Sequence, residues 1–530
     1  MQISLYKFVR YFLSSGDSLT SSQYIAYINM LIGLSTGKES AEHCFLLLQN
    51  TSNVYELQSA KISLNHIFTA LCSYHETFKM GSTAGNKRAG SVGAGGGATF
   101  GGAPSGVGGA TQTTPGAMVN FTQKELQALI SVTKLIKQIA LHNEKARLVL
   151  YEYNNNKSDF NSQYPNCINE NSFTSATQSL SNILFGLVTC PIPIMLKSEL
   201  LNLLATFALA PQLATNMWSQ LEKSQLLVTV PQTAATASMM TMGSVKCDIR
   251  SELDETETRD ECYPLLRAFL SLLLNLISLS AQVPDNLGIG IRPKESVLGF
   301  QPYLQFLVNS VYLKFYHRAY KWESQQEKWE IANLTLEIFF QLIQKCEMSA
   351  GEFQRLMAQS GELGAVNELN AYLNVIKRSN YSILFELIQN GPLARMLFLL
   401  LNDSTNFLFD ENYSATALGK APEKAMMRRS RKMMLDEMRA LIEKTAQISL
   451  RLIDLLVDRQ EMLVDLMKSL NLNTNEMGIE KLLLSINPNT NKADCFQSLL
   501  SFIIYNQFSY RSSVTHESAS LIRHSYDSLR

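Results

Sequence analysis

Helical periodicity runs along most of this 530-residue chain and restricts its fold more than any other feature. A first helix is predicted from apolar residues at the i, i+3, i+4 and i+7 positions: Leu200, Leu203, Leu204 and Phe207. Ser198 is its expected N-cap, and Pro211 is expected to stop it. The same spacing predicts a second short helix through Leu213, Met217, Trp218 and Leu221.

A longer helix is predicted from a third apolar series, Leu441, Ile448, Leu452, Leu455 and Leu456. Capping boxes mark two further helix starts, at Thr122 with Glu125 and at Ser349 with Glu352. No strand-like alternation between turn signals and no Asn-Gly or Asp-Gly hairpin pattern accompanies them. The sequence therefore predicts an all-α protein.

The length of the chain favours a stacked architecture over one compact core. A single core stops growing near about 250–300 residues, whereas a solenoid buries each unit against its neighbours. With 46% hydrophobic and 17% charged residues, most of the chain is expected to be packed. We expect an irregular superhelical α-solenoid of stacked helical hairpins, similar to armadillo or HEAT repeats. An ordinary globular helical protein is the alternative.

Three polar stretches interrupt the helical pattern. Residues 81–120 hold about half of the 27 glycines and are expected to be a disordered Gly/Ser-rich insertion. Residues 153–173 read as an Asn-rich loop, and residues 231–260 as a polar linker. Between them we expect four helical solenoid segments, at residues 1–80, 121–152, 174–230 and 261–530.

Charge and cysteine usage exclude several classes of protein. Lysine plus arginine and aspartate plus glutamate number 46 each, so no direct nucleic-acid binding is predicted at the level of the whole chain. The 8 cysteines are scattered, which favours a reducing compartment. The most apolar stretch, Ile183–Leu196, contains Pro191 and Pro193 and is shorter than the roughly 20 residues of a membrane span. Neither a membrane span nor a secretory signal is expected.

No catalytic, cofactor or metal site is predicted from spacing. The stretch from Gly33 to Ser40 resembles a phosphate loop but has three residues between its glycines and Glu39 at the magnesium position, so a helix–helix turn is favoured. Cys72 and His75 stand one turn apart without a second ligand pair, and His43-Cys44 faces two directions. For both pairs we expect a core thiol and a surface histidine. No nucleophile or metalloprotease motif appears.

Two charged clusters remain. The acidic stretch from Glu252 to Glu261 lacks the ligand pattern of a calcium loop and is expected to be a solvated loop before a helix at Tyr263–Leu279. The basic cluster includes Arg428, Arg429 and Arg431, interleaved with methionines. It fits an import signal, a site for an acidic partner, a membrane-surface face, or the solvated face of a long helix.

Several stretches resemble one known family. The first is Cys190–Leu227, where a proline-rich entry precedes a Leu-rich helix, an Ala-Pro pair and a helix carrying Trp218. The second is Tyr263–Leu279. The third runs from Leu287-Gly288 through Gly299-Phe300-Gln301-Pro302-Tyr303-Leu304-Gln305-Phe306 to Glu327-Lys328-Trp329-Glu330. The others are Ile486-Asn487-Pro488, Lys492-Ala493-Asp494 and the opening Ile3-Ser4-Leu5-Tyr6-Lys7.

In this order and spacing, the chain resembles the giant inner-ring scaffold nucleoporins of the nuclear pore complex. The resemblance implies a structural protein at the nuclear envelope, without enzymatic activity or cofactor, that supports transport between nucleus and cytoplasm. It implies other inner-ring nucleoporins as partners, including linker nucleoporins whose segments dock into surface grooves, for which we expect helix-in-groove docking. Family members are longer, so we expect the chain to be part of a longer protein. A soluble transport receptor or adaptor is the alternative.

The aromatic residues of the third stretch admit two roles. Phe300, Tyr303, Phe306, Phe315 and Tyr320 have the spacing of a helix core, which favours packing. Alternatively, Pro302 and Tyr303 shape the entrance of a groove between helical pairs. Pro302, Tyr303, Arg428, Arg429 and Arg431 are therefore the candidate partner-binding residues.

Overall fold

The computed structural model describes the chain in eleven stretches: residues 21–50, 63–84, 122–153, 179–228, 248–279, 300–321, 324–345, 381–388, 391–409, 428–469 and 496–500. These stretches contain helices and turns but no strand, so the predicted all-α class, an irregular α-solenoid, is confirmed. The chain divides into two compact units. Unit 1 comprises Met1–Phe207 and Gln220–Asp248, and unit 2 comprises Ala208–Ser219 and Ile249–Arg530.

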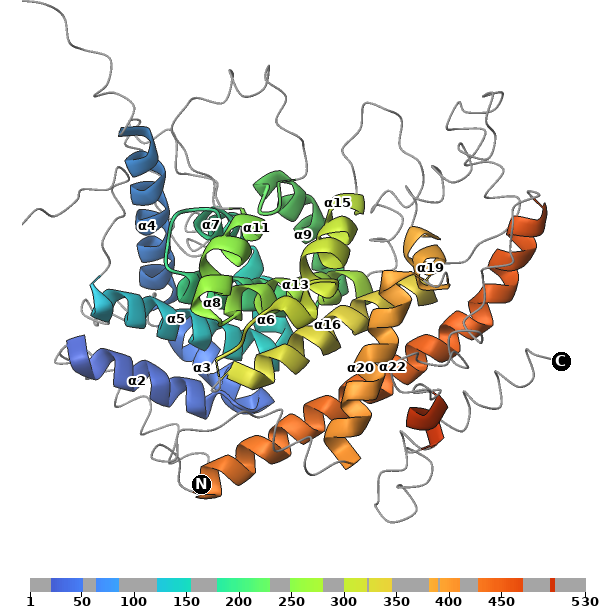
Figure 1. The fold of residues 1–530 in the computed structure, drawn as a ribbon. Helices are drawn as coiled ribbons and strands as arrows, with labels where there is room; N and C mark the ends of the chain where they lie inside the picture. Colours follow the sequence, from blue (N-terminus) through green and yellow to red (C-terminus); the bar gives the residue numbers. More distant parts are fainter. Residues whose placement is uncertain are drawn as a thin grey trace, which may run out of the picture. The chain divides into compact units, whose positions relative to one another are not determined.

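Unit 1 is built around helix α5. Its helices are α2 (Ser21–Leu34), α3 (Lys38–Asn50), α4 (Leu64–Ala84), α5 (Gln123–His142), α6 (Glu144–Tyr151), α7 (Leu180–Val188) and α8 (Ile194–Phe207). Helix α5 packs against α2, α3, α6 and α8, while α7 packs against α4 and α8 (Figure 1). Between α5 and α8, the carboxylate of Glu199 on α8 forms ion pairs with Lys134 and Lys137 of α5, at 3.7 and 3.2 Å.

The predicted capping box begins α5. The Thr122 hydroxyl accepts a hydrogen bond from the Glu125 backbone N–H, and the Glu125 carboxylate accepts one from the Thr122 N–H at 2.9 Å. The hydrogen bond from the Thr122 backbone N–H to the Glu125 carboxylate lowers the pKa of Glu125, and so does a second bond that the Thr122 hydroxyl donates to the same carboxylate at 2.8 Å. The second box, at Ser349 and Glu352, lies outside the described residues.

One predicted N-cap is wrong. Helix α8 begins at Ile194, four residues before Ser198, and the Ser198 hydroxyl bonds to the Met195 carbonyl inside the helix. Pro193 precedes the helix, and its carbonyl accepts the N–H groups of Leu196 and Lys197. A proline at the start of a helix costs no hydrogen bond, because the first N–H groups of a helix have no partner within it. The predicted end is confirmed, since α8 stops at Phe207 and Pro211 opens α9 (Pro211–Ser224).

Unit 2 contains the first part of α9 and the helices that follow it. They are α11 (Ile249–Ser251), the π-helix η3 (Glu252–Glu257), α12 (Thr258–Asp260), α13 (Pro264–Leu279), α15 (Gln301–Gln305), the π-helix η4 (Phe306–Tyr312), the 3-10 helix η5 (Phe315–His317), α16 (Gln325–Gln344), α19 (Tyr381–Ile388), α20 (Pro392–Phe409) and α22 (Arg428–Ser469).

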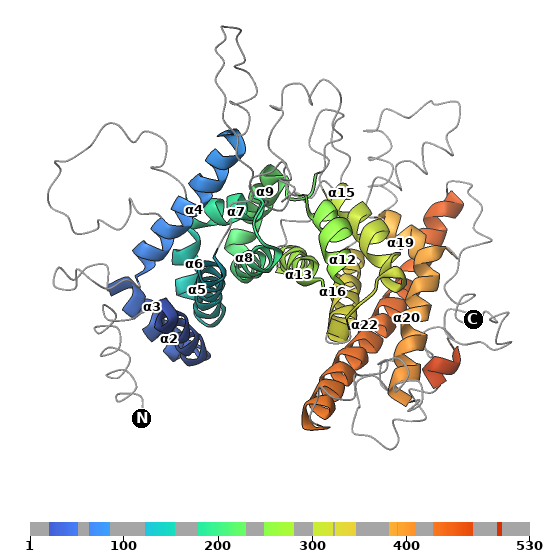
Figure 2. The same cartoon turned by 60° about the vertical axis from the view of Figure 1, so that its left-hand side comes forward.

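Helices α16 and α22 form the centre of unit 2. Helix α16 packs against α13, η4, α19 and α22, and α20 also packs against α22 (Figure 2). The long helix predicted around Leu452 is α22, with 42 residues. No helix among the described residues is long and apolar enough to cross a membrane.

The loop predicted for the acidic stretch is wrong. Residues 249–260 form α11, η3 and α12 in continuous succession, and Glu257 is 1% exposed. The chain turns at Glu261, whose φ of 52° is left-handed, and then enters α13. Of the predicted insertion at residues 81–120, the first four residues belong to α4 (Leu64–Ala84), and residues 85–120 lie outside the described residues. Residues 154–173 and the first part of the predicted linker 231–260, residues 231–247, also lie outside them, and the division into solenoid segments stays a prediction.

Candidate partner-docking site

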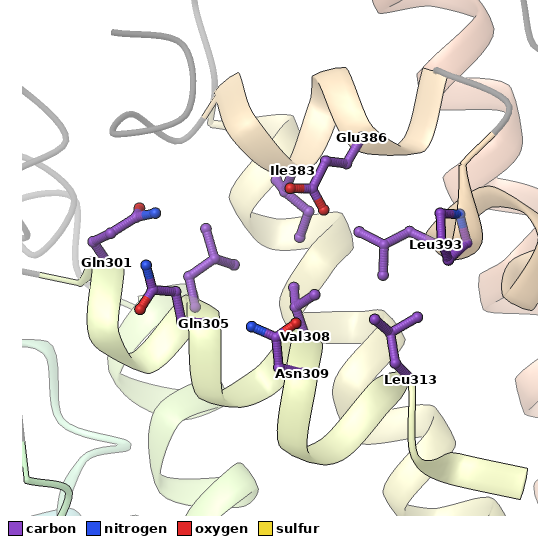
Figure 3. Close-up of a pocket in the computed structure, with 10 residues that line it drawn as sticks. Gln301, Gln305, Val308, Asn309, Leu313, Ile383, Glu386 and Leu393 are labelled. Atoms are coloured by element: carbon purple, nitrogen blue, oxygen red, sulfur yellow. The ribbon is translucent and has the colours of Figure 1, made fainter. Parts of the chain in front are cut away.

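A groove in unit 2 separates α15 and η4 from α19 and the start of α20 (Figure 3). Its cavity volume is about 280 Å³. Small-molecule sites usually have about 300–1,000 Å³, so this groove lies at the small end of that range and has room for one or two side chains of a partner. The residues that line it are Gln301, Leu304, Gln305, Val308, Asn309, Leu313, Ile383, Glu386, Pro392 and Leu393.

Aromatic packing on the inner face of α15 and η4 fixes the first wall. Tyr303 and Phe306 are 0% exposed. The Tyr303 ring lies 5.1 Å from that of Trp218, and Phe306 meets Phe269 of α13 edge-on at 5.9 Å. Because these rings are buried on one side, Gln301, Gln305 and Asn309 lie on the other side, along the groove (Figure 3).

The π-helix continues this wall to Tyr312. Its carbonyl end is held by Arg318, whose guanidinium donates to the carbonyls of Val311, at 2.8 Å, and of Ser310. The same guanidinium carbon lies 5.9 Å from the centre of the Tyr263 ring. Unpaired carbonyls at a helix end need such a donor, and π-helical turns are frequent at functional sites.

The second wall combines two apolar side chains with one charge. Ile383 of α19 and Leu393 of α20 are each 2% exposed, so they form a rigid side of the groove. Glu386 is exposed, and its carboxylate points into the space between the walls (Figure 3). The groove thus combines aliphatic, amide and carboxylate groups, a set suited to binding a peptide segment.

Elsewhere in unit 2, a carboxylate cluster holds the first turn of α13. The Glu257 carboxylate accepts the N–H groups of Leu265 at 2.7 Å and Leu266 at 3.2 Å, and Glu327 of α16 accepts that of Tyr263 at 2.7 Å. Pro264 has no N–H to satisfy. The free N–H groups at the start of α13 are therefore capped by carboxylates from η3 and α16.

The charges in this cluster are unequal. Burial raises the pKa of Glu257 to about 8, against the two backbone hydrogen bonds, and the nearby Glu327 and Glu252 add to the rise. Arg267 pairs with Glu327 at 3.0 Å and also with Glu330. Burial lowers the pKa of Arg267, but these two carboxylates outweigh it and the net change is upward. Sequence spacing did not indicate this cluster, because its members lie up to about 70 residues apart.

The structure places the candidate residues differently. Tyr303 packs in the aromatic core, the role favoured by its spacing, and Pro302 lies half-buried in the first turn of α15, next to the groove residue Gln301. Arg428, Arg429 and Arg431 lie in the first turns of α22, and their side chains are outside the described part. A partner contact at any of these five residues stays a prediction.

The helix–helix turn predicted at the glycines near Gly33 is confirmed, because α2 ends at Leu34 and α3 begins at Lys38. Cys44 is a buried thiol beside the exposed His43, as expected. The expected surface position of His75 is wrong, since its ring packs half-buried against Gly186 of α7, while Cys72 is also half-buried. Among the described residues, no group of three His, Cys, Asp or Glu side chains could hold a metal ion.

A family model described as nuclear pore complex scaffold, nucleoporins 186/192/205, matches residues 2–434. The chain belongs to this Nup192 family. It is 31% identical over 510 residues to the nuclear pore complex protein Nup205 of Homo sapiens, covering 95% of this chain and 21% of that protein. For Nup205 of Drosophila melanogaster the identity is 24% over 506 residues, covering 96% and 20%.

The chain spans about a fifth of the length of these Nup192-family relatives. The matched range includes both walls of the groove and the carboxylate cluster, but only the first turns of α22. The resemblance inferred from the sequence is thereby confirmed at the level of the family.

Proposed function

We propose that this chain is part of a structural component of the nuclear pore complex inner ring, located at the nuclear envelope. There it holds other nucleoporins, including linker nucleoporins, and supports transport between nucleus and cytoplasm. The match of the scaffold family to residues 2–434 carries this proposal. The proposed role is binding rather than catalysis, without a cofactor.

The physical basis of this role is geometric. Helices stacked on their neighbours give an extended surface on which several weak sites can act together, and joining such sites strengthens binding without any new contact. The groove between α15–η4 and α19–α20 is one such site by its shape and lining. Truncating any single site is therefore expected to weaken attachment to the pore rather than abolish it.

The test is localisation of the parent protein, tagged at its genomic locus, followed by chemical crosslinking of its neighbours. A punctate nuclear rim with crosslinks from residues 190–345 to other inner-ring nucleoporins would support the proposal. A diffuse or shuttling signal without nucleoporin neighbours would contradict it and favour a soluble transport receptor or adaptor.

A further inference from the structure

We propose that the groove between α15–η4 and α19–α20 binds an extended segment of a partner protein, which places an apolar side chain on the groove floor and a lysine or arginine beside Glu386. The inference rests on the proposed scaffold function, because it specifies the chemistry of one partner of that scaffold.

The apolar floor sets the first requirement. Leu304, Val308 and Leu313 come from the first wall, and Ile383 and Leu393 from the second. A cavity of about 280 Å³ lined by these residues accepts a side chain of the size of leucine or phenylalanine and excludes a folded domain. One anchored side chain per site is typical of short-segment recognition.

The amide row sets the second requirement. Gln301 and Gln305 are four residues apart, about 6 Å along a helix axis, and Asn309 extends the row. In an extended peptide, alternate residues lie about 6.6 Å apart and present unpaired backbone N–H and C=O groups. A side-chain amide both donates and accepts. Within the part of the chain that the structure describes, the amides of Gln305 and Asn309 make no hydrogen bond to protein, so they suit such a backbone.

The same amides disfavour a docked helix, the mode expected from the sequence. A helix pairs its backbone groups internally, so it offers an amide row only side chains. Helix-binding grooves gain their affinity from apolar anchors one and two turns apart, whereas one wall of this groove carries three amides along that length. The lining therefore favours an extended occupant.

The charge of the groove sets the third requirement. Glu386 is the only charged residue among those that line the groove in the described part of the chain. Figure 3 shows its carboxylate directed between the two walls, toward the side of Asn309. A cationic side chain on the occupant is attracted there, and an acidic one is repelled, which fixes both the composition and the direction of the segment.

The experiment uses the parent protein expressed from its own locus, with Pro392 replaced by the photo-crosslinking amino acid p-benzoyl-phenylalanine, because Pro392 is an exposed groove residue outside the amide row. After irradiation of living cells, mass spectrometry identifies the crosslinked peptide. The expected product is a segment of another nucleoporin in which an apolar residue lies within a few positions of a lysine or arginine. Glu386→Lys is expected to lower its yield roughly three- to tenfold. When the lysine or arginine of the crosslinked partner segment is changed to glutamate, the crosslink yield in the Glu386→Lys variant is expected to be restored.

Glu461→Lys is the matched control, because Glu461 is an exposed glutamate of α22 that does not line the groove. Nuclear-rim fluorescence of each variant separates the two proposals. If nuclear-rim fluorescence is normal but Glu386→Lys leaves the crosslink yield unchanged, the inference is overturned and the proposed function is not. The same holds if the charge swap in the partner fails to restore the yield. A crosslink to residues 346–380 of the same chain, to a second copy, or to a helix of a folded domain also overturns the inference. A diffuse wild-type protein overturns the proposed function.

Discussion

Glu257→Gln is the most informative change in the carboxylate cluster at α13. The amide keeps an oxygen that can accept the Leu265 N–H, but it cannot titrate. Glu257 is 1% exposed, and burial, with the repulsion of Glu327 and Glu252, raises its pKa from 4.5 to about 8. We expect the substitution to remove one defined component of the pH dependence of unit 2.

The sign and size of that component follow from the shift. Between about pH 4.5 and 8, the folded protein retains a proton on Glu257 that the unfolded chain has released. The stabilisation is complete below pH 4.5 and is lost as the pH rises through 8. At 1.36 kcal/mol per pKa unit, the free energy of unfolding falls by roughly 4–5 kcal/mol across this window.

The assay is urea unfolding at intervals between pH 5 and 8.5, followed by tryptophan fluorescence, because all 3 tryptophans fall in unit 2. The wild-type midpoint is expected to decline with pH, and the Glu257→Gln midpoint to decline less. Glu255→Gln, an exposed neighbour in η3, is the control and keeps the wild-type decline. Equal declines for Glu257→Gln and wild type would refute the reasoning, as would a wild-type midpoint that rises with pH.

Three further changes test single contacts. Gly186→Ala places a Cβ 2.3 Å from His75 Nε2, so it is expected to lower the stability of unit 1 by about 1–3 kcal/mol in a thermal scan, and an unchanged melting temperature would contradict this. Thr122→Ala removes the capping box of α5 and is expected to cost about 1 kcal/mol, seen as faster amide exchange in its first turn only. The Tyr312 hydroxyl is buried without a hydrogen-bond partner in the described structure. Tyr312→Phe is therefore expected to stabilise unit 2 by about 1 kcal/mol, and a lower urea midpoint would contradict this.

Helices were predictable because their signals are local. Apolar residues at helical spacing fixed α8, α9 and α22, and the side chains of Thr122 and Glu125 lie within one turn of each other. The error at Ser198 arose because a serine before an apolar run is also tolerated inside a helix, where its hydroxyl bonds back to a carbonyl. Pro193 was the better start signal.

The acidic stretch and the groove were not predictable for a different reason. A run of acidic residues normally indicates a solvent-exposed segment. Nothing in the spacing shows that the Glu257 carboxylate accepts hydrogen bonds from the N–H groups of Leu265 and Leu266. Pro264 does mark a helix start that needs acceptors, so it is the available signal. The groove is lined by residues from Gln301 to Leu393, about 90 positions apart in the sequence. The amides at positions 301, 305 and 309, spaced one helical turn apart, are a signal that could have marked this face.

Helix α22 has a mechanical consequence. Its 42 residues make a rod about 63 Å long, and α16, α19 and α20 all contact it. In a regular solenoid, each helical hairpin contacts only its neighbours, so a pulling force separates the hairpins one at a time. In unit 2, a force applied to any of these three helices is instead transmitted to the other two through the continuous helix α22. This part of the molecule is therefore expected to resist bending.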